Sequence, residues 1–165
     1  MPDRPGPSLV IAPASVQDAE GISRLILALR HSFLLDAQGV GAEAFLQALS
    51  PSAIAQLIDA QNMRYLKAMH GDQLVGVVAV RDGTHLYHLF VDTLFQGKGL
   101  GRMLWEYILS AERHQESVRA FTVNSSVSAV PIYERFGFRV TGARTETKGI
   151  AFIPMRRDPE AVPGA

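Results

Sequence analysis

The spacing of apolar residues predicts four helical segments. Apolar side chains recur there at intervals of three and four residues, which gathers them on one face of a helix. These segments are residues 16–30, 51–60, 100–111 and 128–136, and a short segment around Phe45, Leu46 and Leu49 precedes the second of them. Ser15 followed by Asp18 has the form of a capping box, and Ser50-Pro51 places proline at the first position of a helix. Gly137 follows the fourth segment, where a residue with left-handed backbone often ends a helix.

Runs of aliphatic, aromatic and β-branched residues predict strands between these helices. The runs are residues 65–69, 74–80, 85–91, 118–123, 138–140 and 150–155. The turn pairs Gly71-Asp72 and Asp82-Gly83 separate the first three runs, which predicts an antiparallel meander. Elements in this order pack most economically as one layer of mixed β-sheet covered by helices, so the predicted fold class is α+β, or α/β with a mixed sheet.

Length and composition limit the number of domains. The chain has 165 residues, of which 47% are apolar and 19% charged, and this is enough to fill one hydrophobic core. No linker or internal repeat divides it. We therefore expect a single domain over residues 9–157. Flexible ends are expected at residues 1–8 and 158–165, where apolar residues are few and prolines are frequent.

Charge and cysteine content exclude several classes of function. Sixteen Lys and Arg residues balance sixteen Asp and Glu residues, whereas proteins that bind nucleic acid through its phosphates usually carry a basic excess. The absence of cysteine removes disulfides, thiolate metal ligands and a cysteine nucleophile. No apolar run approaches the roughly 20 residues that cross a bilayer, and residues 1–7 form no apolar signal core. We expect a cytoplasmic protein with no nucleic-acid or membrane partner.

The segment Gln96-Gly97-Lys98-Gly99-Leu100-Gly101 lies between a predicted strand and a predicted helix. Its backbone N–H groups would converge at the positive end of the helix dipole, where anions bind, and Lys98 and Arg102 add positive charge. The alternative is an ordinary glycine-rich turn. Two phosphate-binding motifs fail: the dinucleotide fingerprint needs glycine where Arg102 or Leu104 stands, and the P-loop needs Ser or Thr where Gly99 stands.

The pattern that fits is Gln-x-x-Gly-x-Gly directly after a strand ending in Leu89-Phe90-Val91-Asp92. Further along, Asn124 precedes a predicted helix that carries Tyr133 and closes in Gly137-Phe138. Together these features resemble the acyl-CoA-binding signature of the GNAT superfamily of N-acetyltransferases, and the resemblance covers the expected domain. It implies a splayed central mixed sheet of about six to seven strands flanked by about four helices.

The resemblance also implies acetyl-CoA as co-substrate. Its pantetheine arm would lie between the strands ending at Val91 and Val123 and pair with the first of them as an added strand would. Residues 96–102 would hold the pyrophosphate. The implied cofactor-binding residues are Leu89, Phe90, Val91, Gln96, Gly97, Lys98, Gly99, Leu100, Gly101, Arg102 and Asn124.

Acetyl transfer to an amine needs a base for the amine proton and a proton for the departing thiolate. The resemblance assigns the second role to Tyr133, for which the alternative is a ring packed under the sheet. The base stays open between His85, His88 and water, although some family members carry it eleven residues before the position of Gln96, which is His85. Strand alternation predicts His85 on the face of Leu89 and His88 on the opposite face, so only one histidine would face the site. The same opposition argues against a metal site, and we expect no metal.

The resemblance therefore predicts direct acetyl transfer, in a ternary complex, from acetyl-CoA to a primary amine of a small molecule or peptide. The alternative is a non-catalytic acyl-CoA-binding regulatory module. Residues 30–41 and 143–149 would line the acceptor site. In the second of these segments, Arg144, Glu146 and Lys148 fit an acceptor pocket or a solvated hairpin, and we favour the hairpin. The acceptor and the oligomeric state stay open, although homodimers are frequent in the family.

Overall fold

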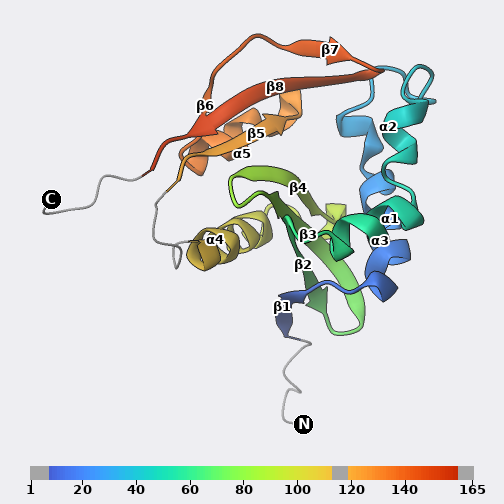
Figure 1. Cartoon of the computed structure of the whole chain (residues 1–165), viewed down its shortest axis with the longest axis vertical. Helices are drawn as coiled ribbons and strands as arrows, with labels where there is room; N and C mark the ends of the chain where they lie inside the picture. Colours follow the sequence, from blue (N-terminus) through green and yellow to red (C-terminus); the bar gives the residue numbers. More distant parts are fainter. Residues whose placement is uncertain (1–7, 113–118, 160–165) are drawn as a thin grey trace, which may run out of the picture.

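The computed structural model describes residues 8–112 and 119–159. Within these residues, one sheet is covered by helices on both faces (Figure 1). Its strands are β1 (Leu9–Pro13), β2 (Met63–His70), β3 (Gln73–Arg81), β4 (His85–Val91), β5 (Phe121–Ser125), β6 (Arg139–Val140), β7 (Thr145–Thr147) and β8 (Ile150–Arg157). The α-helices are α1 (Ala19–Ala28), α2 (Glu43–Gln47), α3 (Pro51–Asp59), α4 (Leu100–Glu112) and α5 (Val130–Arg135).

The strand order of the sheet is β1-β2-β3-β4-β5-β8-β6, and β7 pairs with β8. The β4–β5 pair is parallel, and the other pairs of described strands are antiparallel. Gly71 and Gly83 adopt positive φ angles of 60° and 69° in the turns that join β2, β3 and β4. The predicted meander and the mixed-sheet fold class are confirmed.

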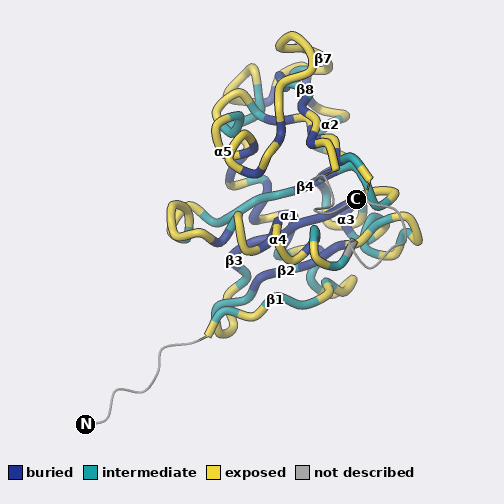
Figure 2. The backbone as a smooth tube through the Cα atoms, turned by 90° about the vertical axis from the view of Figure 1, so that its left-hand side faces the viewer, coloured by how far each residue is buried: buried dark blue, intermediate teal, exposed yellow. Residues whose placement is uncertain are grey.

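Two apolar clusters fill the two faces of the sheet. On one face, Leu104 of α4 and Tyr133 of α5 belong to the cluster that buries Val78 of β3. On the other face, Ile26 of α1 lies in the cluster that buries Val77. Neighbouring residues of a strand point to opposite sides, so β3 contributes to both clusters. Figure 2 shows β3 buried over most of its length and many of the loops exposed.

The structure differs from the predicted elements in several places, and the main ones are the first helix and two short strands. The first helix is α1 flanked by two 3-10 turns, η1 (Val16–Asp18) and η2 (Arg30–Ser32). The strands β1 and β7 were not predicted, because β1 is a short edge strand and β7 is an exposed Thr-Glu-Thr sequence with no apolar pattern. Both are strands because a longer partner, β2 or β8, supplies the hydrogen bonds.

Some predictions fall on residues that the structure does not describe. These are the ends at residues 1–7 and 160–165 and the start of the fourth predicted strand at residue 118. No helix in the described part of the chain has the length and apolar composition needed to cross a bilayer. In that part, no three His, Asp or Glu side chains gather as a metal site requires.

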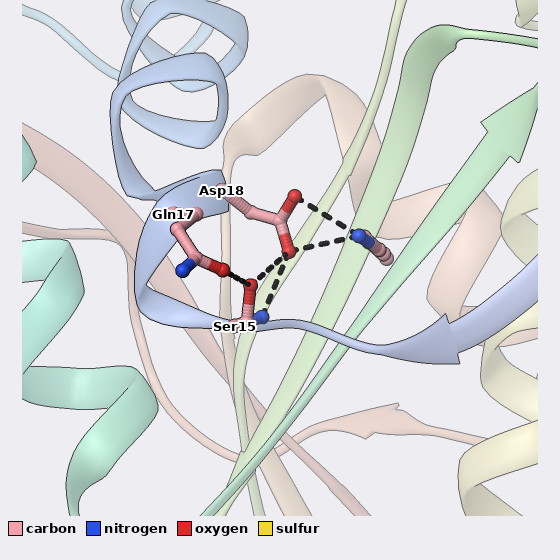
Figure 3. Close-up of polar contacts among 4 residues, drawn as sticks. Ser15, Gln17 and Asp18 are labelled. Atoms are coloured by element: carbon pink, nitrogen blue, oxygen red, sulfur yellow. Dashed lines mark hydrogen bonds and ion pairs between the residues drawn. The ribbon is translucent and has the colours of Figure 1, made fainter.

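A polar junction joins η1 to β2. The Asp18 carboxylate accepts a hydrogen bond from the Ser15 backbone N–H at 2.8 Å, which matches the predicted capping box (Figure 3). Lys67 of β2 donates to both carboxylate oxygens at 2.9 Å. Burial raises the pKa of Asp18, but the hydrogen bonds from Ser15 and Lys67 and the Lys67 charge outweigh it and hold that pKa below its usual value.

Candidate functional site

The parallel strands β4 and β5 separate soon after they begin. Their register contains two residue pairs, His85 with Thr122 and Leu86 with Val123. Beyond Leu86, β4 is paired to β3 alone, and beyond Val123, β5 is paired to β8 alone, among the strands of the described residues. The facing edges of the two strands therefore carry unpaired backbone N–H and C=O groups, which can bind an extended ligand.

The glycine segment connects the end of β4 to the start of α4. Gly97 and Gly99 have φ angles of 74° and 84°, which favour glycine, and open space surrounds the position of a Cβ at either residue. The backbone hydrogen bonds of the described residues include none donated by residues 97–102, and the first helical bond of this region runs from Met103 N–H to the Gly99 carbonyl at 3.0 Å. A row of free N–H groups thus opens α4, as an anion site requires.

The side chains of this segment have separate surroundings. Gln96 Nε2 donates to the Val91 carbonyl at 2.9 Å and so fixes the segment to the end of β4. Leu100 is buried in the core, which leaves its backbone N–H as the group that a ligand can reach. Lys98 Nζ lies 5.6 Å from the centre of the Phe95 ring and is exposed.

Arg102 is directed toward the end of α5. Its Nη2 atom donates to the Arg135 carbonyl at 3.4 Å, and its guanidinium lies 5.2 Å from the centre of the Phe136 ring. Glu106 lies one helical turn further along α4, and its Oε1 atom is 3.8 Å from Arg102 Nη1. Arg102 therefore connects the two helices, in addition to bringing positive charge to the first turn of α4.

The remaining predicted cofactor residues lie on β4 and β5, the two strands that separate. Leu89 and Val91 turn their side chains to the α4 side and Phe90 to the α1 side, so their backbone is what they offer to a ligand. Asn124 is exposed on β5, next to the last residue of that strand. Beyond the paired residues, the backbone of β4 and the backbone of β5 at Asn124 therefore form the two edges of one gap.

Tyr133 of α5 has a buried ring, and its hydroxyl has no hydrogen-bond partner among the described residues. Its ring packs against Phe136 and Phe138, with centroid distances of 6.1 and 5.7 Å. Every completely buried polar side-chain atom of the described residues has a hydrogen-bond partner. The Tyr133 hydroxyl has none among these residues, so it is not completely buried and keeps some contact with solvent. Burial raises the pKa of Tyr133, which keeps the phenol protonated and able to donate.

A β-bulge overturns the predicted alternation of β4. Ala79 of β3 stands opposite His88, but Val80, the next residue, stands opposite Leu86, so Tyr87 is an extra residue. His85 pairs with Arg81, which lies on the same face of β3 as Ala79. The prediction that His85 and His88 point to opposite faces is therefore wrong.

The apolar residues of β4 agree with this register. Leu86 and Leu89 both belong to the cluster on the α4 side, which leaves His85 and His88 on the α1 side. An extra residue shifts the phase of a strand by one position, and the sequence pattern does not contain this information.

The two histidines differ in burial. His88 is 7% exposed, and its Nδ1 atom lies 2.8 Å from the Tyr65 hydroxyl of β2. Burial lowers the pKa of His88 to about 3, so this ring stays neutral throughout the physiological range. Sequence reasoning missed Tyr65, because its contact depends on the pairing of β2, β3 and β4.

His85 is half-buried and remains accessible. Burial and, secondarily, the charge of Arg81 lower its pKa below 6.5. Its Nδ1 atom lies 2.8 Å from Thr122 Oγ1 on β5. A neutral, accessible imidazole beside the gap can accept a proton at working pH, which His88 cannot do as readily because burial opposes its charged form.

The two segments predicted to line the acceptor site meet in space. Leu34 forms an isolated bridge with Ile150, and Leu35 N–H donates to the Gly149 carbonyl at 3.0 Å. Thr145–Thr147 and the start of β8 form a hairpin, with Lys148 and Gly149 at positive φ between them. The hairpin interpretation of residues 143–149 is confirmed, and the α1–α2 connection is tied to its base.

Comparison with known proteins agrees with these features. A family model described as an acetyltransferase (GNAT) domain matches residues 33–159, which is more than half of the chain. No curated protein matches the sequence. The PaiA N-acetyltransferase from Thermoplasma acidophilum in complex with coenzyme A has a similar structure, with a TM-score of 0.74, 14% identity, and coverage of 92% of this chain and 99% of that chain.

Two further solved structures have the same fold. Ard1 from Thermoplasma volcanium has a TM-score of 0.69 and 18% identity, covering 93% of this chain and 99% of that chain. An aminoglycoside 6'-N-acetyltransferase complexed with coenzyme A has a TM-score of 0.68 and 11% identity, with the same coverage. These likenesses establish the fold, and the family model establishes membership: the chain belongs to the GNAT acetyltransferase family.

Proposed function

We propose that the protein transfers the acetyl group of acetyl-CoA to a primary amine of a small molecule or peptide, directly and within a ternary complex. The observation that carries this proposal is the separation of β4 and β5 beyond Leu86 and Val123. It leaves an amide-lined gap with an anion site at one end, and coenzyme A combines an amide-bearing arm with a pyrophosphate. The solved coenzyme A complexes of two proteins with this fold support the same assignment.

Each part of the gap has a role in this proposal. The unpaired edge of β4 from Leu89 to Val91 binds the amide groups of pantetheine as an added strand would. The free N–H groups of residues 97–102 bind the pyrophosphate, with Lys98 and Arg102 adding charge. Asn124 contacts the arm from the opposite edge. The thioester of bound acetyl-CoA supplies the acetyl group.

The proposed acid and base approach the gap from opposite faces of the sheet. Tyr133 lies in the cluster on the α4 side, and its hydroxyl donates a proton to the departing thiolate. His85 lies on the α1 side, where β4 and β5 begin to separate, and takes the amine proton directly or through one water. This arrangement keeps the proton donor and the proton acceptor apart while both reach the reacting atoms.

A thiol-release assay with acetyl-CoA over a panel of amines tests the activity. The panel contains amino acids, polyamines, an aminoglycoside and peptides with free N-termini, and calorimetry measures coenzyme A binding in parallel. We expect binding together with amine-dependent thiol release for at least one class. Binding without release across the panel would instead support the non-catalytic acyl-CoA-binding module.

The pyrophosphate assignment predicts that Gly101→Val weakens acetyl-CoA binding. Gly101 is a better position than Gly97 or Gly99, because its φ is not positive and an added Cβ would meet Val91 Cγ2 at an ordinary 3.9 Å. Blocked hydrogen bonds to a charged group should raise the Kd about tenfold or more. Gly21→Val in α1, where a Cβ would also meet one side-chain atom at 3.6 Å, is the control. An unchanged Kd in folded Gly101→Val would refute the assignment.

Tyr133→Phe should lower kcat and leave acetyl-CoA affinity nearly unchanged. The substitution keeps the ring packed against Phe136 and Phe138 and removes only the hydroxyl, which has no protein partner among the described residues. Loss of an acid commonly lowers the rate by roughly 10²-fold to 10⁴-fold. Steady-state kinetics, with a single-turnover measurement to isolate chemistry, checks the effect, and an unchanged chemical step would make Tyr133 a packing residue.

The assignment of the base predicts different pH effects for the two histidines. The pKa of His85 lies below 6.5, and a base works only when it is unprotonated. The value of kcat/KM should therefore fall as the pH drops through the pKa of His85, and His85→Gln should remove this acidic limb of the pH–rate profile. His88→Gln should retain it.

For the pH dependence of folding stability, we expect the effect at His88. The pKa of His88 is depressed on folding, so the unfolded chain binds its proton first and stability falls as pH decreases below about 6.5. His88→Gln should weaken this pH dependence, measured by denaturant unfolding. If His88→Gln removed the acidic limb of kcat/KM and His85→Gln retained it, His88 would be the base.

A further inference from the structure

His85 and Thr122 form a hydrogen-bonded pair where β4 and β5 begin to separate. Thr122 Oγ1 lies 2.8 Å from His85 Nδ1, and the two residues are also register partners in the parallel pair. Backbone pairing and the side-chain contact therefore hold the imidazole at a defined place beside the gap. Neither residue type nor spacing in the sequence indicates this contact.

Burial and one neighbouring charge favour the neutral form of the His85 ring. Arg81 stands opposite His85 on β3, and Arg156 stands opposite Thr122 on β8. Asp158 accepts a hydrogen bond from Arg156 Nε at 2.8 Å, so this second cation is paired. Burial and the Arg81 charge lower the pKa of His85, and a neutral imidazole carries its single proton on one of two nitrogens.

The position of that proton decides what His85 can do. If Thr122 donated to Nδ1, the proton of the ring would lie on Nε2, and His85 would present only a donor to the amine. If Thr122 accepts from Nδ1–H, the lone pair of Nε2 is available as a base. Thr122 is exposed and can give its own hydroxyl proton to water, so it is able to serve as the acceptor.

We propose that Thr122 is a positioning residue that accepts the Nδ1–H hydrogen bond of His85 and thereby directs the basic Nε2 atom toward the acceptor amine. The inference rests on the proposed function. In the proton transfer, an amine N–H bond breaks and the Nε2–H bond forms, so His85 becomes an imidazolium that still donates Nδ1–H to Thr122. Water then removes the proton from Nε2 after the acetyl group has moved.

The tautomer can be measured without any activity. Nitrogen-15 NMR of the histidine-labelled protein, above the pKa of His85, distinguishes a protonated ring nitrogen from one that carries a lone pair. His85→Gln assigns the signals. We expect Nδ1 to be protonated and Nε2 to carry the lone pair, and we expect Thr122→Val to shift the population toward Nε2–H. A parent protein with Nε2 protonated would overturn the proposal.

Kinetics test the consequence. Thr122→Val should lower kcat/KM about tenfold or more, because a histidine in the wrong tautomer is a poor base, and Thr122→Ser should restore most of the loss. In the His85→Gln background, Thr122→Val should have an effect of less than about twofold, since the two residues act as one unit. Thr141→Val, which removes a hydroxyl bonded to the Pro154 carbonyl at 3.2 Å, is the matched control.

The outcomes separate the two proposals. If no amine is acetylated while the NMR signals show Nδ1–H and respond to Thr122→Val, the proposed function fails and the hydrogen-bond assignment stands. If the protein is active and Thr122→Val lowers kcat/KM equally with and without His85, the positioning role is overturned and the catalytic proposal stands.

Discussion

The structure depends on the interruption of the sheet between β4 and β5. A sheet normally pairs its strands along their length, whereas these two share only two residue pairs. Each strand is held instead along its other edge, β4 by β3 and β5 by β8, and the cluster beneath α4 and α5 joins both halves. Unsatisfied backbone groups are costly when they lose water, so the gap favours a ligand with amide groups of its own.

The bulge at Tyr87 determines how the gap is used. By shifting the phase of β4, it brings His85 to the α1 side of the sheet, opposite the cluster beneath α4. It also places His85 and His88 on one face in very different surroundings, one accessible and the other bonded to Tyr65 in the core. Two residues of the same type therefore differ in their ability to titrate, because burial differs along one strand.

Local sequence pattern predicted the elements well where the pattern is strong. The bounds of β4 agree with its apolar run, and α3 begins at Pro51 as its start signal indicates. The pattern failed at β1 and β7, because a short edge strand and a polar hairpin strand owe their structure to the partners β2 and β8. The glycine segment was also predicted, since glycines between a strand pattern and a helix pattern leave a clear local signal. In the structure, Gly97 and Gly99 adopt positive φ.

The sequence by itself determined the meander, the glycine segment before α4 and the place of Tyr133 on a short helix. Its motifs were also sufficient to show the resemblance to the GNAT superfamily. Only the tertiary structure decided which face His85 occupies, how far each histidine is buried, and that Thr122 bonds to it. The reason is physical. Turn and helix signals act between residues close in the chain, whereas strand register, burial and cross-strand hydrogen bonds are set by segments that meet only after the chain has folded.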